Sequence, residues 1–149
     1  DCRLFSSTGA AQPIASTGPP VVAEMNLMAP LAGTVLDLDV YQLDIDHTYI
    51  SDLDIELIHP DGTTALFWDQ ACGSQNNISA SFDDEASGEA PCPPTDGGFY
   101  TSASDQLSLF DNLPVTGTWT LRVTDNADVD GGSLNGFTLK ICLEDGQTL

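Results

Sequence analysis

Basic residues are scarce in this chain of 149 residues: Arg3, Arg122 and Lys140 stand against 23 aspartates and glutamates. The formal net charge of -20 repels polyanions, so the composition excludes nucleic acid and anionic membrane surfaces as partners. No apolar run approaches the ~20 residues that a membrane helix needs. The N-terminus lacks the basic and apolar regions of a signal peptide, so we expect a mature, soluble fragment of a larger protein.

Residues suited to catalysis are also few. His47 and His59 are the two histidines, and they are the candidates for a general base near neutral pH. Neither a Gly-x-Ser-x-Gly motif nor a separate cysteine nucleophile accompanies them. We therefore interpret His47 as a structural residue bonded to a neighbouring carboxylate, and we predict no catalytic residue. A glycosidase would need only two carboxylates suitably spaced in the fold, which a residue count does not test.

The four cysteines lack the close pairs that zinc sites favour, so we expect disulfides. Four cysteines allow three pairings. We favour Cys72 with Cys92, which would close a long polar loop, and Cys2 with Cys142, which would pin an N-terminal arm to the last strand. Disulfides in turn predict a secreted, extracellular location.

Apolar and polar residues alternate over short stretches, and no stretch keeps a helical period. Residues 53–58 read Leu-Asp-Ile-Glu-Leu-Ile, the pattern of a strand with one buried face. The alternation within residues 36–45 shifts by one residue at Tyr41-Gln42, which indicates a β-bulge. Further strands are expected at residues 65–68, 78–82, 106–110, 118–124 and 137–143. Short strands between Gly and Pro turns predict an all-β fold, an antiparallel β-sandwich.

Three segments of the chain, in order, carry a family resemblance. The first is the strand and turn of residues 47–63, which contains Pro60-Asp61-Gly62; the second is a central loop and the third a closing hairpin. These two contain Cys72-Gly73-Ser74, Asn76-Asn77-Ile78, Phe82-Asp83-Asp84-Glu85-Ala86 and Cys92, then Gly117-Thr118-Trp119-Thr120-Leu121, Asp125, Asp130, Gly132, Leu134 and Phe137. Together they resemble the P domain, also called the homoB domain, which follows the catalytic domain of kexin, furin and secreted bacterial subtilisin-like proteases.

The resemblance implies a sandwich of jelly-roll type over residues 21–145. An N-terminal arm or linker at 1–20 and a C-terminal tail at 146–149 would flank it. It also implies a non-catalytic accessory domain that stabilises the catalytic domain of a secreted subtilisin-like protease or assists its maturation, so that catalytic domain would be the partner. The alternative is an independent module that targets an enzyme to an insoluble protein or glycan substrate.

One candidate calcium site is the segment Asn126-Ala127-Asp128-Val129-Asp130-Gly131. It has the oxygen-donor spacing of the first half of a calcium loop, in which alternate side chains point inward and glycine permits a sharp turn. Asn126 stands at the first position, and Asp125 just upstream would supply the missing carboxylate. The alternative is an ordinary hairpin turn rich in Asp, Asn and Gly.

The second candidate site is the Asp83-Asp84 loop. Adjacent aspartates repel each other unless a cation or hydrogen-bond donors lie between them, and the resemblance implies that this loop is a calcium region. We expect its carboxylates to gather with oxygens from Asn76 or Asn77, or from the strand that carries Asp52 and Asp54. The alternative is a solvated loop. Ca²⁺ is therefore the expected cofactor.

Overall fold

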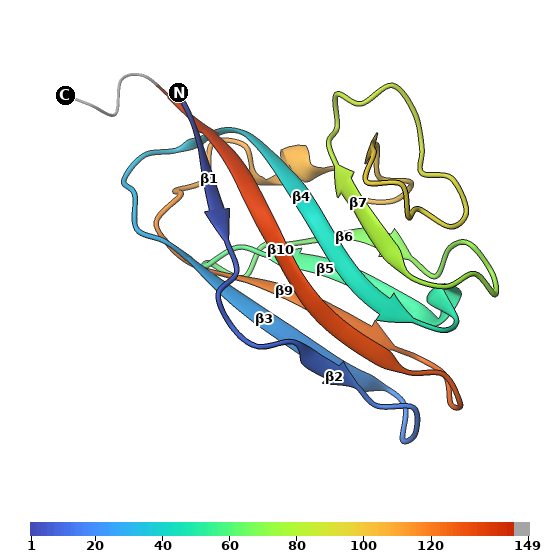
Figure 1. The fold of residues 1–149 in the computed structure, drawn as a ribbon. Coiled ribbons are helices and arrows are strands. Elements are labelled where there is room, and N and C mark those ends of the chain that lie inside the picture. The colour runs from blue at the N-terminus through green and yellow to red at the C-terminus, as the bar shows by residue number, and fades with distance from the viewer. Residues whose placement is uncertain (145–149) are drawn as a thin grey trace.

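The computed structural model describes residues 1–144, and it folds them into two sheets packed face to face (Figure 1). Within these residues the helical elements are two short 3-10 helices, η1 (Ile50–Asp52) and η2 (Leu107–Phe110). The predicted β-sandwich is confirmed, and its strand orders are consistent with a jelly roll. Residue 145 of the predicted domain and the predicted tail at 146–149 lie outside the described residues. No helix within residues 1–144 is long and apolar enough to cross a membrane.

The first sheet has six strands in the order β1-β10-β4-β7-β8, with β2 also paired to β10. Neighbouring strands run antiparallel except β7 and β8, which are parallel. The strands are β1 (Cys2–Ser6), β2 (Gln12–Ile14), β4 (Val35–His47), β7 (Ile78–Phe82), β8 (Phe99–Tyr100) and β10 (Gly132–Leu143).

The second sheet is antiparallel, with the order β3 (Val21–Ala29), β9 (Gly117–Asp125), β5 (Leu53–Ile58) and β6 (Thr64–Asp69). Its inner face and that of the first sheet enclose the core, in which Trp119 is completely buried, as expected from its phase in the strand. Strand β3 was not predicted, although Ala23, Met25 and Leu27 face the core and alternate with exposed residues.

The segment at residues 106–110 was predicted to be a strand and is instead η2. Both carboxylate oxygens of Asp84 accept hydrogen bonds from the backbone N–H groups of Leu107 and Ser108, which holds the first turn. Leu107 and Phe110, three residues apart, both face the core, so the apolar spacing belongs to a helical turn. A sequence of five residues is too short for its period to distinguish these states.

The predicted β-bulge in β4 is confirmed. The register with β7 passes from Val40 directly to Leu43, and Gln42 between them has a φ of 53°. Val40 and Leu43 both face the core despite their odd spacing. Ahead of the bulge, Asp37 and Asp39 therefore point to the outer face of the first sheet, because side chains alternate along a strand.

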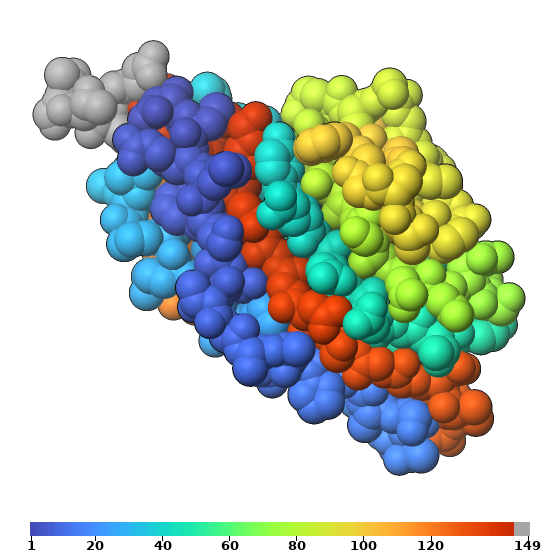
Figure 2. Space-filling model, viewed as in Figure 1, coloured from blue at the N-terminus to red at the C-terminus, as the bar shows by residue number. Residues whose placement is uncertain are grey.

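Residues 1–20 contribute β1 and β2 to the first sheet, both along β10. Figure 2 shows this segment lying along β10, and the segment that follows β7 forming a raised lobe beside the same sheet. Both disulfides that we favoured are present in the structure. Cys2–Cys142 joins residues directly opposed on β1 and β10, and Cys72–Cys92 joins the loop after β6 to the loop before β8.

Candidate metal centre

Three carboxylates converge on the outer face of the first sheet. Asp37 and Asp39 lie two residues apart on β4, and Glu85 approaches them from the loop that follows β7. One oxygen from each of the three lies within 4.8 Å of the others, and residues 1–144 contain no other group of three acidic, histidine or cysteine side chains this close. We call Asp37, Asp39 and Glu85, together with the adjoining Asp83, the acidic cluster.

Asp39 is the buried member of the acidic cluster, with 2% of its surface exposed. Its Oδ1 has no hydrogen-bond partner among the described residues. Burial raises the pKa of Asp39 to about 8, and the charges of Asp37 and Asp83 act in the same direction. An ionised Asp39 is therefore costly unless a positive charge lies beside it.

Glu85 is exposed but is also perturbed. A hydrogen bond between the carboxyl groups of Asp83 and Glu85, followed by partial burial and the charge of Asp37, raises the pKa of Glu85 to about 7. Asp83 accepts a hydrogen bond from the backbone N–H of Glu85 at 2.8 Å, which fixes the loop in a tight turn. The loop thus holds its carboxylates close together rather than letting them separate into solvent.

Asp84 has a structural role beside the acidic cluster. Its Oδ1 and Oδ2 accept backbone hydrogen bonds at 3.0 and 2.8 Å from the first residues of η2, as described above. Asp111, after η2, also has a buried oxygen without a hydrogen-bond partner in the described chain. Burial raises the pKa of Asp111, and the charges of Asp37 and Asp84 add to the shift. This end of the first sheet therefore concentrates negative charge.

The structure does not bring Asn77, Asp52 and Asp54 to the acidic cluster, contrary to our prediction. Asn77 precedes β7 whereas Asp83 follows it, so the length of the strand separates them. The Oδ1 of Asn77 instead accepts a hydrogen bond from the backbone N–H of His47.

Asp52 and Asp54 belong with the closing loop. Asn126 donates from Nδ2 to Oδ2 of Asp54 at 3.1 Å and to the carbonyl of Asp52 at 3.0 Å. Partial burial raises the pKa of Asp52, and the charges of Asp125 and Asp130 add to this while His47 opposes it. These predicted ligands are therefore close to one another, at the end of the sandwich where β9 finishes.

One oxygen of each predicted aspartate ligand in this loop already accepts a hydrogen bond. The Oδ1 of Asp128 accepts from the backbone N–H of Gly18 at 3.2 Å, and the Oδ1 of Asp130 accepts from the Thr48 hydroxyl at 2.8 Å. Both contacts tie the closing loop to neighbouring segments. These contacts fit the alternative to a calcium loop, an ordinary polar turn. They do not test metal binding, and Asp128 and Asp130 as metal ligands stay a prediction.

Asp125 is buried away from the loop surface. Its Oδ2 lies 2.8 Å from Nε2 of His47, and its Oδ1 accepts a hydrogen bond from the backbone N–H of Ala127. Both oxygens are thus engaged in the interior, and this argues against Asp125 as a calcium ligand. His47 is bonded to a carboxylate, as we interpreted it from the sequence.

Sequence reasoning missed Asp37, Asp39 and Glu85 as members of a site. The signal was present, because two acidic residues alternate with apolar ones on β4 immediately before a bulge. Alternating acids ordinarily indicate a solvated strand face, and nothing in the sequence shows that the loop after β7 covers this one.

The family model of the proprotein convertase P-domain matches residues 40–141. The chain belongs to this family. P domains are accessory domains of serine proteases. The matched range contains Asp83 and Glu85 and begins one residue after Asp39.

Solved structures agree with this assignment at the level of the fold. The serine protease of Aeromonas sobria matches 97% of this chain with a TM-score of 0.60 and 18% identity. A second structure, of the same protease in complex with its chaperone, gives a TM-score of 0.59 at 18% identity and also covers 97% of this chain. This chain spans 26% of the length of each matched protease chain. No curated protein matches the sequence significantly.

Proposed function

We propose that this P domain binds a calcium ion at the acidic cluster and serves as a non-catalytic accessory domain of a secreted subtilisin-like protease. The observation that carries the calcium proposal is Asp39, a carboxylate with 2% exposure and an unpartnered oxygen beside Asp37 and Glu85. A folded protein rarely buries such a group without a compensating charge. Lys140 lies opposite Asp39 on β10, but its Nζ lies over the Tyr41 ring, 5.6 Å from the ring centroid, so we assign the compensating charge to a divalent cation.

The donor set favours a hard cation. All members of the acidic cluster offer carboxylate oxygens, which suit Ca²⁺, Mg²⁺ and Mn²⁺ better than zinc or copper. The ligands come from a strand and a loop, an arrangement that tolerates the larger coordination shell of calcium. Bound calcium would keep the carboxylates of Asp39 and Glu85 ionised and would relieve the repulsion among them.

The accessory role follows from the family and from mass action. A domain that packs only on the folded catalytic domain raises the apparent stability of that domain, and binding to its folding intermediates would assist maturation. Two disulfides support the proposed secreted location. In this scheme calcium stabilises the P domain, and the P domain stabilises the catalytic domain that precedes it.

The calcium proposal is tested by thermal unfolding and calorimetric titration of the chain in calcium and in chelator. We expect calcium to raise the melting temperature of the native sequence. Asp39→Asn should abolish most of that rise, whereas Asp130→Ala should leave it intact and lower stability equally in both conditions. An equal melting temperature in calcium and in chelator would refute the proposal. Loss of the calcium response in Asp130→Ala alone would move the site to the closing loop.

A test of the accessory role requires the parent protease. Thermal inactivation should be measured for the full protease and for a version truncated before the P domain. We expect truncation to accelerate inactivation or to prevent maturation. Equal inactivation rates, together with loss of binding to insoluble protein or polysaccharide on truncation, would support the targeting alternative and overturn ours.

A further inference from the structure

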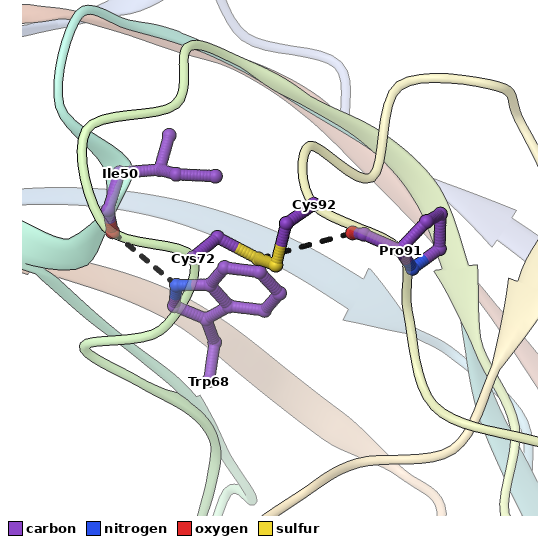
Figure 3. The surroundings of a disulfide bond; sticks show 5 residues. All are labelled: Ile50, Trp68, Cys72, Pro91 and Cys92. Atoms are coloured by element: carbon purple, nitrogen blue, oxygen red, sulfur yellow. Dashed lines mark hydrogen bonds between the residues drawn. A yellow bond between two sulfur atoms is a disulfide. The ribbon is translucent and has the colours of Figure 1, made fainter.

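A pocket lies beside the Cys72–Cys92 disulfide, lined by residues of β6, the end of β7 and the segments that flank β8. Its volume is about 260 Å³. Figure 3 shows the indole ring of Trp68 next to the disulfide. Phe67 and Phe82 also line the pocket, and both are almost completely buried. We call it the disulfide pocket.

The apolar wall of the disulfide pocket is held in place before any ligand binds. Trp68 donates from Nε1 to the backbone carbonyl of Ile50 at 3.3 Å, and its ring packs edge to face on Phe82 with centroids 6.2 Å apart. The hydroxyl of Ser102 donates to the carbonyl of Phe67 at 3.1 Å, which ties the segment after β8 to β6. A wall constrained in this way loses little entropy when a ligand enters.

The remaining lining residues are small or polar, and two of them are acidic. Asp69 and Glu89 both line the disulfide pocket and are both exposed. The pocket thus combines an aromatic floor with negative charge reached from solvent. A ligand that satisfies both surfaces needs an apolar stem and a positive end, and a cation near an indole ring gains a further attraction.

We propose that the disulfide pocket binds an arginine or lysine side chain of a partner protein, with the stem against Trp68 and the cation near Asp69 and Glu89. The volume suits a single side chain, because pockets for whole small molecules usually occupy about 300 to 1,000 Å³ and this one is smaller. The formal charge of -20 on the chain steers a basic partner toward it. This proposal does not depend on the calcium site.

The test uses N-acetylarginine amide as the probe and N-acetylnorleucine amide as its uncharged counterpart. NMR reports the indole N–H signals of the two tryptophans separately, and the completely buried Trp119 serves as an internal control. We expect a saturable shift of the Trp68 signal alone, with a Kd of about 1 mM. The norleucine compound should bind at least about threefold more weakly.

Two variants test where the cation and the apolar stem of the probe bind, and a third serves as the control. Asp69→Asn combined with Glu89→Gln should weaken binding of the arginine probe at least about threefold. Glu24→Gln combined with Asp46→Asn removes the same charge elsewhere on the domain and should leave binding of the arginine probe unchanged. Ala103→Phe, at an exposed lining position, should block the pocket. Equal binding of both probes, equal loss in the two charge variants, or no Trp68 shift would each overturn the proposal.

Discussion

His47 and Asp125 form a buried pair that joins the two sheets of the P domain. His47 ends β4 of the first sheet and Asp125 ends β9 of the second, and His47 Nε2 lies 2.8 Å from Asp125 Oδ2 with both side chains fully buried. The backbone N–H of Tyr49 donates to Nδ1 of His47 at 3.0 Å. Nδ1 is therefore an acceptor, and the proton on Nε2 is donated to the Asp125 carboxylate.

The first prediction is that His47→Ala lowers the free energy of unfolding by about 3 to 5 kcal/mol, because it leaves the Asp125 carboxylate buried with a single remaining donor. Chemical denaturation measures the change. The control is Arg122→Ala, which breaks the exposed pair with Glu24 and should cost at most about 1 kcal/mol. Comparable losses in the two variants would show that the buried pair does not couple the sheets.

More of the fold than of the candidate site could be predicted from the sequence. Alternation in β5 and the phase shift in β4 report directly which side chains face the core, so the sandwich and its bulge followed from local sequence. The segment of η2 misled us because its two buried residues fit either a strand or one helical turn. The acidic cluster depends on a contact between β4 and the loop after β7, more than 40 positions later, which no local pattern encodes.

The predicted calcium residues show the same limit. Asp83 was identified through the family resemblance and does lie in the acidic cluster, whereas Asn77 was expected beside it and lies at the other end of β7. Loop spacing suggested Asp128 and Asp130, but spacing does not reveal the partners that each carboxylate already has. In the fold those partners are Gly18 and Thr48, from segments distant in sequence.

A second prediction concerns Gly132, at the start of β10. A Cβ added there would collide with the backbone carbonyl of Asp46 on β4, and the strand pairing leaves that backbone little room to move. We expect Gly132→Ala to lower the free energy of unfolding by about 1 to 3 kcal/mol. Gly9→Ala meets nothing within 4 Å and should change it by no more than about 0.5 kcal/mol. Thermal melts of both variants decide the matter, and a neutral Gly132→Ala would contradict the packing.

A third prediction separates the two disulfides. Cys2–Cys142 links residues 140 positions apart, and Cys72–Cys92 links residues 20 apart. In the chain-entropy model their removal costs about 5 and about 3 kcal/mol, because the longer loop restricts the unfolded chain more. Denaturation of the two double Cys→Ser variants measures both losses. A larger loss for the shorter loop would mean that the disulfide pocket, not chain entropy, governs the contribution of Cys72–Cys92.

The last prediction concerns pH in the absence of metal. The pKa of Asp39 is about 8 in the folded protein and 3.8 as the ordinary value, so between these values the folded state holds a proton that the unfolded state releases. The contribution of protonated Asp39 to the free energy of unfolding in chelator should therefore be fully present below about pH 4. It should fall as the pH rises toward 8, by up to about 1.4 kcal/mol per pH unit for one proton.

Urea denaturation at several pH values in chelator measures this slope, and Asp39→Asn supplies the comparison because an amide does not titrate. The variant should show a flatter slope over the same range, while its other carboxylates are unchanged. Calcium should remove most of the loss above pH 7 in the native sequence, because the cation replaces the proton as the compensating charge. If the slopes of the native chain and the variant coincide in chelator, Asp39 is ionised at neutral pH without help, and the argument for a cation at the acidic cluster loses its basis.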